Sequence, residues 1–235
     1  MVFFFEILYV KDLKKPSMSK HPHKTITLFW SFRSPYSYLA LPRLQALSAS
    51  TGVAIDMRVV HPNILRNPNY FKTMNALARP YFMRDTARTA EFLGMPFRRP
   101  IPDPIQQNPT TLEVSSDQPL ARWLGHLGIA ATEAGRGFNF CLEVSRLLWD
   151  GAVDQWNEGE HLKNACLRAG LDWTELSTQV GARPDYYEQQ LQANADALTA
   201  AGHWGVPTMV YGKETFFGQD RIDVLAWCIR KDTTT

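Results

Sequence analysis

The sequence predicts an α/β fold in which a long all-helical segment separates two strand-containing parts of the chain. Three observations support this prediction. Strand-like runs rich in β-branched and aromatic residues occur near residues 25–60 and again near 207–217. Helical periodicity dominates from roughly residue 71 to 198. The chain shows neither an internal repeat nor a low-complexity stretch, so we expect no solenoid or linker.

The first strand-containing part predicts a strand–helix–strand unit. Residues 25–30 form the first strand, and 31–36 form a turn. Leucines recur at helical spacing in residues 37–50, and Gly52 is expected to end that helix. Residues 53–60 alternate like a second strand. A connection this short favours parallel pairing of the two strands.

The middle of the chain predicts helices around a proline-rich stretch. Residues 96–109 are rich in proline, and we expect them to form an ordered wrap over the helical insertion. The expected helices cover residues 81–93, 119–134, 137–149, 159–169 and 186–201.

The last part of the chain predicts a hairpin followed by a helix. Residues 207–211 and 214–217 read as strands joined by a tight turn at Gly212 and Lys213. A helix is expected from Asp220 to about Arg230. Together with the first unit, this order is the thioredoxin topology with a large all-helical insertion. We assign residues 25–69 and 202–232 to the thioredoxin-like domain, 70–201 to the insertion, and 1–24 to a poorly ordered extension.

Composition limits the possible functions. The chain has 235 residues, 45% of them hydrophobic, and a net charge of +2, which argues against a nucleic-acid groove. No apolar run is long enough to cross a bilayer, and the N-terminal segment lacks signal-peptide features, so we expect a cytoplasmic protein. Cys141, Cys166 and Cys228 lie far apart, as expected for buried thiols in a reducing compartment. Their spacing with histidine implies no metal site.

The first motif with chemical meaning is Ser34-Pro35-Tyr36-Ser37, between a strand and a helix. In this topology the position usually holds Cys-x-x-Cys, whose thiolate is stabilised by the helix N-terminus. With serine at both ends no protein disulfide can form, but the helix end can still stabilise the thiolate of a bound cofactor. The alternative is that Ser34 is only an N-cap followed by proline at the first helical position.

The second motif, Gly205-Val206-Pro207-Thr208, enters the third strand. It suggests a cis peptide bond between Val206 and Pro207, which in this topology holds a free backbone N–H and C=O opposite the active-site helix. A cysteine-containing ligand can pair with these groups like an added strand. The alternative is an ordinary proline at the start of a strand.

The third motif is the turn Phe216-Phe217-Gly218-Gln219-Asp220-Arg221. Gly218 permits close approach of a ligand, and exposed N–H groups at the start of a helix suit a carboxylate. Gln219 and Asp220 could hold the ammonium and carboxylate of a γ-glutamyl group. The alternative is that Asp220 only caps the helix.

In this order and separation, SPYSYLA, GVPT and FFGQDR resemble the 2-hydroxychromene-2-carboxylate isomerase family and its relatives, the kappa-class glutathione transferases. Both have DsbA-like thioredoxin folds, and the resemblance runs from about Thr25 to Arg230. It implies a glutathione site in which Ser34 hydrogen-bonds the sulfur and Val206 pairs with the cysteinyl backbone. The γ-glutamyl end would lie on Phe217, Gly218, Gln219 and Asp220.

The resemblance also implies polar residues for substrate binding between the second strand and the first insertion helix. The candidates here are Asn63, Arg66, Asn69, Lys72, Arg79 and Tyr81. His61 and His203 are interpreted as surface or core histidines with no catalytic role.

The resemblance favours a glutathione-dependent isomerase whose substrate would be a small aromatic unsaturated carboxylate. Thiolate addition, bond rotation or ring opening, and elimination would make up the reaction. The alternatives are a glutathione transferase or peroxidase with the same pocket, and a non-catalytic thiol- or peptide-binding protein. A homodimer is expected from the resemblance, with no nucleic-acid or membrane partner.

Overall fold

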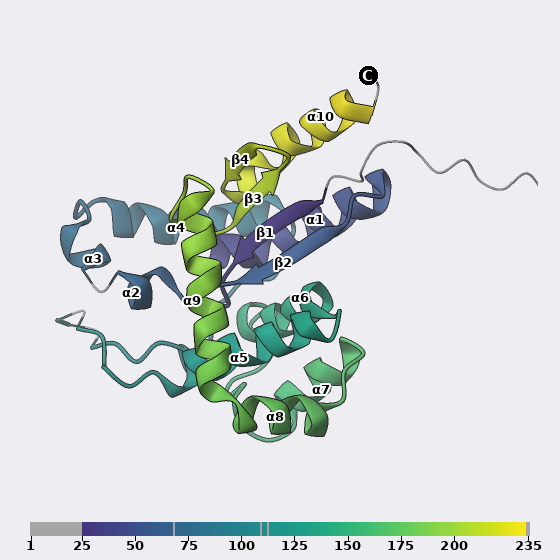
Figure 1. Ribbon diagram of the computed structural model, residues 1–235. Helices are drawn as coiled ribbons and strands as arrows, with labels where there is room; N and C mark the ends of the chain where they lie inside the picture. Colours follow the sequence, from purple (N-terminus) through teal and green to yellow (C-terminus); the bar gives the residue numbers. More distant parts are fainter. Residues whose placement is uncertain (1–24, 68, 109, 112, 234–235) are drawn as a thin grey trace, which may run out of the picture.

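The computed structural model describes residues 25–67, 69–108, 110–111 and 113–233, and its centre is a four-stranded mixed sheet (Figure 1). The strand order is β2 (Ile55–Val59), β1 (Ile26–Trp30), β3 (Thr208–Tyr211) and β4 (Glu214–Phe217). The β1 strand pairs in parallel with β2 and antiparallel with β3, which pairs antiparallel with β4. The predicted strands, the parallel pair and the hairpin are confirmed. The predicted extension at 1–24 lies outside the described residues.

The helix after β1, α1 (Pro35–Thr51), has the expected start and end. Ser34 is its N-cap, Pro35 occupies its first turn, and Gly52 ends it with a φ of 72°. A positive φ of this kind is costly for other residues, which explains why the helix ends at a glycine.

Side chains along β1 point alternately to the two faces of the sheet, and helices pack against both faces. Ile26, Leu28 and Trp30 are fully buried in the main core together with α1. Phe29 points to the opposite face, where it packs with Ala195 and Leu198 of α9 (Pro184–Ala200). In Figure 1, α9 accordingly crosses in front of the strands, while α1 lies behind them.

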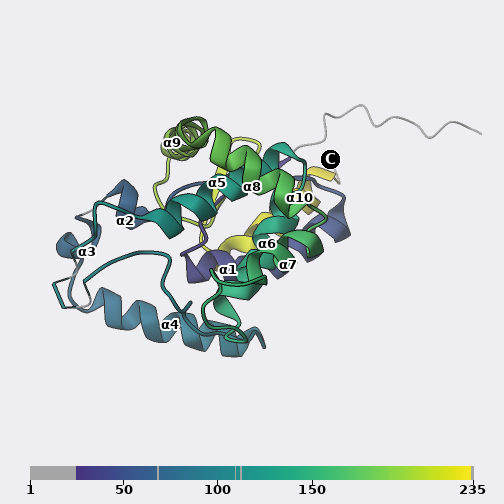
Figure 2. The same cartoon turned by 90° about the horizontal axis from the view of Figure 1, so that it is seen from below.

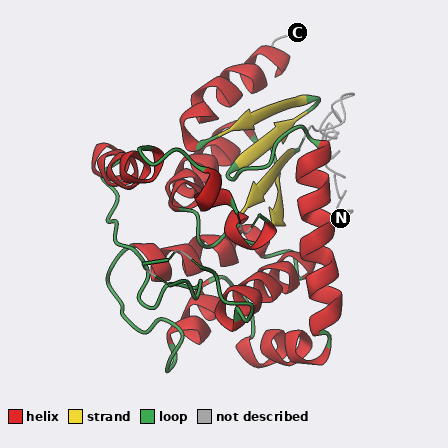
Figure 3. Ribbon diagram, turned by 90° about the vertical axis from the view of Figure 1, so that its left-hand side faces the viewer, coloured by secondary structure: helices red, strands yellow, loops and turns green. Residues whose placement is uncertain are grey.

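The remaining helices surround one end of the sheet, as Figures 2 and 3 show from below and from the side. They are α2 (Asn63–Arg66), α3 (Tyr70–Thr73), α4 (Ala78–Phe92), α5 (Pro119–Glu133), α6 (Gly137–Trp149), α7 (His161–Arg168) and α8 (Trp173–Ala182). Besides the short helices α2 and α3, the sequence prediction missed α8. Only Leu176 and Val180 of this helix are buried, so its apolar periodicity is too short to recognise.

The end of the hairpin differs from the prediction. Gln219–Arg221 form a 3₁₀ turn, and the final helix, α10 (Ile222–Thr233), begins two residues later than expected. No side-chain capping bond is found at this turn within the described residues. The predicted start of the helix at Asp220 is therefore wrong by two residues, and no capping bond in the described part of the chain supports the alternative that Asp220 only caps the helix.

None of the helices in the described part of the chain combines the length and apolar character needed to cross a bilayer. The same residues contain no cluster of three or more histidine, cysteine or acidic side chains suited to a metal ion.

Candidate active site

The N-terminus of α1 faces the loop before β3, and one serine connects them. The Ser34 hydroxyl oxygen accepts a hydrogen bond from the backbone N–H of Ser37 at 3.2 Å. The same hydroxyl donates to the carbonyl of Val206 at 3.3 Å, across 172 residues of sequence. Ser34 is thus both the helix cap of the simpler interpretation and a contact with the second motif.

The Val206–Pro207 peptide bond is cis, as predicted. The Val206 carbonyl receives the Ser34 hydroxyl, and no hydrogen bond to the Val206 N–H is found among residues 25–233 as described. Gly205 is buried just before it, and a Cβ there would lie 2.5 Å from Cε2 of Phe217. The backbone at Val206 therefore offers a donor to a ligand at the end of α1.

The turn after β4 lies against the same loop through aromatic stacking. The rings of His203 and Phe217 stack with centroids 4.0 Å apart, and the Gly205 N–H donates to Nδ1 of His203 at 2.9 Å. Burial lowers the pKa of His203 below its usual value, so at neutral pH the ring is uncharged and accepts this bond.

The polar residues of this turn have different partners. Arg43 of α1 donates to the carbonyl and to Oε1 of Gln219, at 2.7 and 2.9 Å, which leaves the Gln219 amide N–H₂ as a donor. Asp220 is mostly exposed, and its ion-pair contact with Arg221 is long at 3.7 Å. At Gly218, φ is 99° and a Cβ would lie 2.4 Å from Oδ1 of Asp220. Only glycine at position 218 therefore leaves open the space beside the Asp220 carboxylate.

A largely apolar cavity of about 330 Å³ opens beside Ser34. Ser34, Val206 and Phe217 lie in its wall, so the first two motifs and the start of the third meet there. Asp220 lies outside it, in a shallow depression that also includes Phe217. The aromatic residues of the cavity wall are Tyr36, Tyr70, Phe82, Phe97, Trp149, Trp204 and Phe217.

A hydrogen bond beside the cavity joins α1 to α4. The hydroxyl of Tyr36 donates to Asp85, whose carboxylate also accepts from Arg88. Burial and the bond to Asp85 raise the pKa of Tyr36 well above its usual value. The bond from Tyr36 in turn lowers the pKa of Asp85. Tyr36 therefore remains protonated and holds α4 in place rather than acting as a base.

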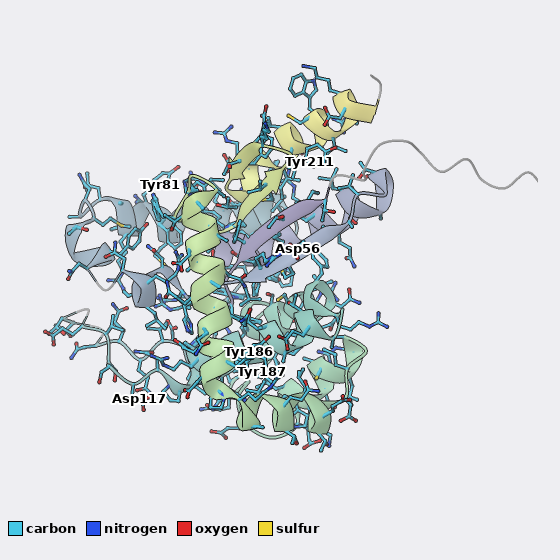
Figure 4. The ribbon with its side chains drawn as sticks, in the orientation of Figure 1. Asp56, Tyr81, Asp117, Tyr186, Tyr187 and Tyr211 are labelled. Carbon is cyan, nitrogen blue, oxygen red and sulfur yellow. The ribbon has the colours of Figure 1, made fainter. Side chains whose placement is uncertain are left out.

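The proposed substrate residues do not all reach the cavity. Asn63 and Arg79 line it, and Nδ2 of Asn63 has no partner among the described residues. Asn69 is exposed outside it. Tyr81, which is labelled in Figure 4, is also exposed, and its hydroxyl donates to Asp85.

Two further candidates behave differently. Arg66 donates to the carbonyls of His61 and Trp204, so it braces the loops instead of facing the cavity. Lys72 belongs to α3, but its side chain lies outside the described part of the structure.

Sequence reasoning missed the contribution of the proline-rich stretch. Phe97, Arg99 and Asp103 from this segment form one wall of the cavity, so the stretch is part of the site and not only a wrap over the insertion. Phe97 stacks on Trp149 of α6, with ring centroids 5.7 Å apart and an interplanar angle of 8°. Proline alternates with arginine and aspartate at residues 98–104, but this local pattern does not specify where in the fold the segment packs.

The three cysteines lie away from the cavity. Cys141 and Cys166 are buried in α6 and α7, and Cys228 is half-buried in α10, so the expectation of full burial holds for two of them. Burial raises the pKa of the Cys141 and Cys166 thiols. With serine at positions 34 and 37, the end of α1 has no thiol of its own.

Comparison with known families defines the class. The model of the DSBA-like thioredoxin domain matches residues 25–230, and the chain belongs to this family. A comparison with curated proteins finds no match.

Solved structures share the fold at low sequence identity. A 2-hydroxychromene-2-carboxylate isomerase has a TM-score of 0.66 and 18% identity, over 88% of this chain and 95% of that one. A probable DsbA oxidoreductase from Streptomyces coelicolor has a TM-score of 0.62 and 18% identity, over 89% of each chain. The cytosolic disulfide reductase DsbM from Pseudomonas aeruginosa, solved with GSH, has a TM-score of 0.58 and 13% identity, over 90% of this chain and all (100%) of that one.

Proposed function

We propose that this protein is a glutathione-dependent isomerase of a small aromatic unsaturated carboxylate. The observation that carries the proposal is the contact between Ser34 and Val206 in the wall of an aromatic-lined cavity of about 330 Å³. A helix N-terminus without a cysteine, beside a pocket of ordinary ligand size, is suited to a thiol brought in by a cofactor.

The residues around Ser34 fit glutathione. The Val206 N–H is available to the cysteinyl backbone, in the manner of an added strand. The Asp220 carboxylate can accept the γ-glutamyl ammonium, and the Gln219 amide N–H₂ can donate to the adjacent carboxylate. The open space at Gly218 leaves room for this end of the molecule.

When bound, glutathione would supply a thiolate that adds to the conjugated carbon, permits rotation, and is then eliminated. The hydroxyl of Ser34 would turn from the Val206 carbonyl to the sulfur and stabilise its negative charge. The N-terminus of α1 adds its partial positive charge at the same place. The aromatic walls would hold the flat substrate and exclude water.

The proposal is tested by following isomerisation of 2-hydroxychromene-2-carboxylate with and without glutathione, alongside calorimetric titration of glutathione. Isomerisation leaves the glutathione concentration unchanged, whereas a transferase or peroxidase consumes it with each turnover. S-methylglutathione is the matched control, because it keeps the peptide but cannot form a thiolate. Absence of glutathione binding at millimolar concentration would refute the proposal.

Two further expectations belong to this proposal. The protein acts in a reducing compartment such as the cytoplasm, where glutathione is abundant in its thiol form. It forms a homodimer, as the family resemblance implies, and sedimentation of the purified chain tests this state.

A further inference from the structure

A cluster of two arginines and one aspartate lies in the cavity wall next to Ser34. Arg33, the residue before Ser34, forms a bidentate pair with Asp103, with Nε to Oδ1 at 2.7 Å and Nη2 to Oδ2 at 3.0 Å. Arg99 also donates to Oδ2 of Asp103, at 3.0 Å. All three residues line the cavity. Arg33 is mostly buried, with its side chain 14% exposed, so this pair is a fixed part of the wall.

The aspartate of this cluster has no remaining capacity for another donor. Its Oδ1 also accepts the backbone N–H of Ile105 at 2.9 Å, which brings the number of hydrogen bonds on the carboxylate to about four, its usual limit. Burial acts to raise the pKa of Asp103, but the hydrogen bonds and charge of Arg33 hold it below its usual value. Asp103 is therefore ionised at neutral pH.

The arginines, in contrast, keep donors to spare. A guanidinium has roughly five N–H donors. In the described part of the chain, Arg33 uses two of them and Arg99 uses one, all on Asp103. Two positive charges against one negative charge leave the cluster with a net positive charge at an apolar surface. Such a cluster favours an anion with planar oxygens, because a carboxylate matches the fork of a guanidinium.

The wall beside the cluster has one further unpartnered hydrogen-bonding group among the described residues and a flat apolar surface. The hydroxyl of Ser31, a residue 1% exposed, has no hydrogen-bond partner among the described residues. Phe97 and Trp149 stack in parallel beside it in the same cavity. Trp149 is fixed in position, because its Nε1 donates to the carbonyl of Phe32 at 2.9 Å.

We propose that Arg33 and Arg99, held by Asp103, form a carboxylate-binding subsite that orients the aromatic acid against Ser34. The inference rests on the proposed function only in taking the cavity ligand to be an aromatic carboxylate. It places the anionic group at the proline-rich wall, which comes from a different segment of the chain than the sequence candidates at residues 61–81. The aromatic ring then lies along the apolar wall of the same cavity.

The test compares cinnamate with cinnamamide, which has nearly the same shape without the charge, by calorimetric titration. Wild type is expected to bind cinnamate about tenfold more tightly or better, as charge-assisted hydrogen bonds predict. In Arg99→Gln, that preference falls toward one. Arg99 is 46% exposed and its loss leaves the Arg33–Asp103 pair in place, so this variant keeps the fold.

Arg58→Gln is the matched control. Arg58 is 47% exposed and pairs with a single aspartate, Asp56, on β2, and neither residue is among the described residues that line the cavity. This variant should keep the wild-type preference for cinnamate. Glutathione is titrated into each variant separately, and its affinity should not change in Arg99→Gln.

Three results would overturn the subsite: wild type binds neither probe, Arg99→Gln keeps the full preference for cinnamate, or Arg99→Gln weakens glutathione as much as cinnamate. The last result would assign the arginines to a carboxylate of glutathione. If wild type prefers cinnamate through Arg99 but does not bind glutathione, the subsite stands and the proposed isomerase function fails.

Discussion

Replacing Ser34 with alanine separates its structural role from its proposed chemical role. The change removes a helix cap, worth about 1 kcal/mol, and the hydrogen bond to Val206, worth roughly another 1 kcal/mol. In a chain of this size, about 2 kcal/mol corresponds to a fall in Tm of roughly 4–8 °C. The fold therefore survives.

The effect on bound glutathione is a separate quantity. A hydrogen bond to a charged group contributes about 1.5–3 kcal/mol, which equals roughly 1–2 pKa units. The pKa of the bound thiol should therefore rise by this amount in Ser34→Ala, and turnover at neutral pH should fall with the thiolate fraction. The partial charge of α1 persists, so some thiolate remains.

The assay is a pH titration of thiolate ultraviolet absorbance at saturating glutathione, with S-methylglutathione as the blank. Ser37→Ala is the control, because the Ser37 hydroxyl is buried without a partner in the described residues and its backbone N–H is kept. The control should titrate like wild type. A Ser34→Ala protein with lowered Tm but unchanged thiol pKa and turnover would reduce Ser34 to a helix cap, and the active-site assignment would be wrong.

Two other predictions concern the ligand turn and a buried charge cluster. Asp220→Ala should weaken glutathione binding in calorimetry with little change in Tm, since no capping bond is lost; the opposite pattern would remove Asp220 from the site. Burial lowers the pKa of His61 despite its contact with Glu188 at 3.0 Å. Below about pH 6.5 the unfolded chain therefore binds more protons than the folded chain, and the free energy of unfolding falls as the pH drops through that value. His61→Gln should flatten the dependence of Tm on pH below about 6.5. An unchanged slope in this variant would contradict the prediction.

The order of the elements could be predicted from the sequence, because each signal is local. The alternation of apolar and polar residues predicted the strands. The helical spacing of leucines predicted α1, and Gly52 predicted where this helix ends. The cis bond before Pro207 was predicted from its place in the topology. The polar helix α8 was missed, since only two of its residues are buried and a helix of that kind depends on packing more than on pattern.

The site divides in the same way. The sequence by itself shows serine before α1 where a thiol is usual, and it predicts that Val206 and the turn at Gly218 belong to the same site. Only the tertiary structure decided which side chains face the cavity. Asn63 and Arg79 reach it while Asn69 and Tyr81 do not, although all four come from one stretch of sequence.

The arginine cluster was decided by tertiary structure alone. Arg33 and Asp103 are 70 residues apart, and their pairing depends on the proline-rich stretch folding back to form a wall of the cavity. Charge and periodicity describe neighbours along the chain, whereas a buried ion pair depends on the packing of whole elements. The sequence therefore determined the fold and the serine at the start of α1. Only the folded chain determined which charged side chains lie around that serine.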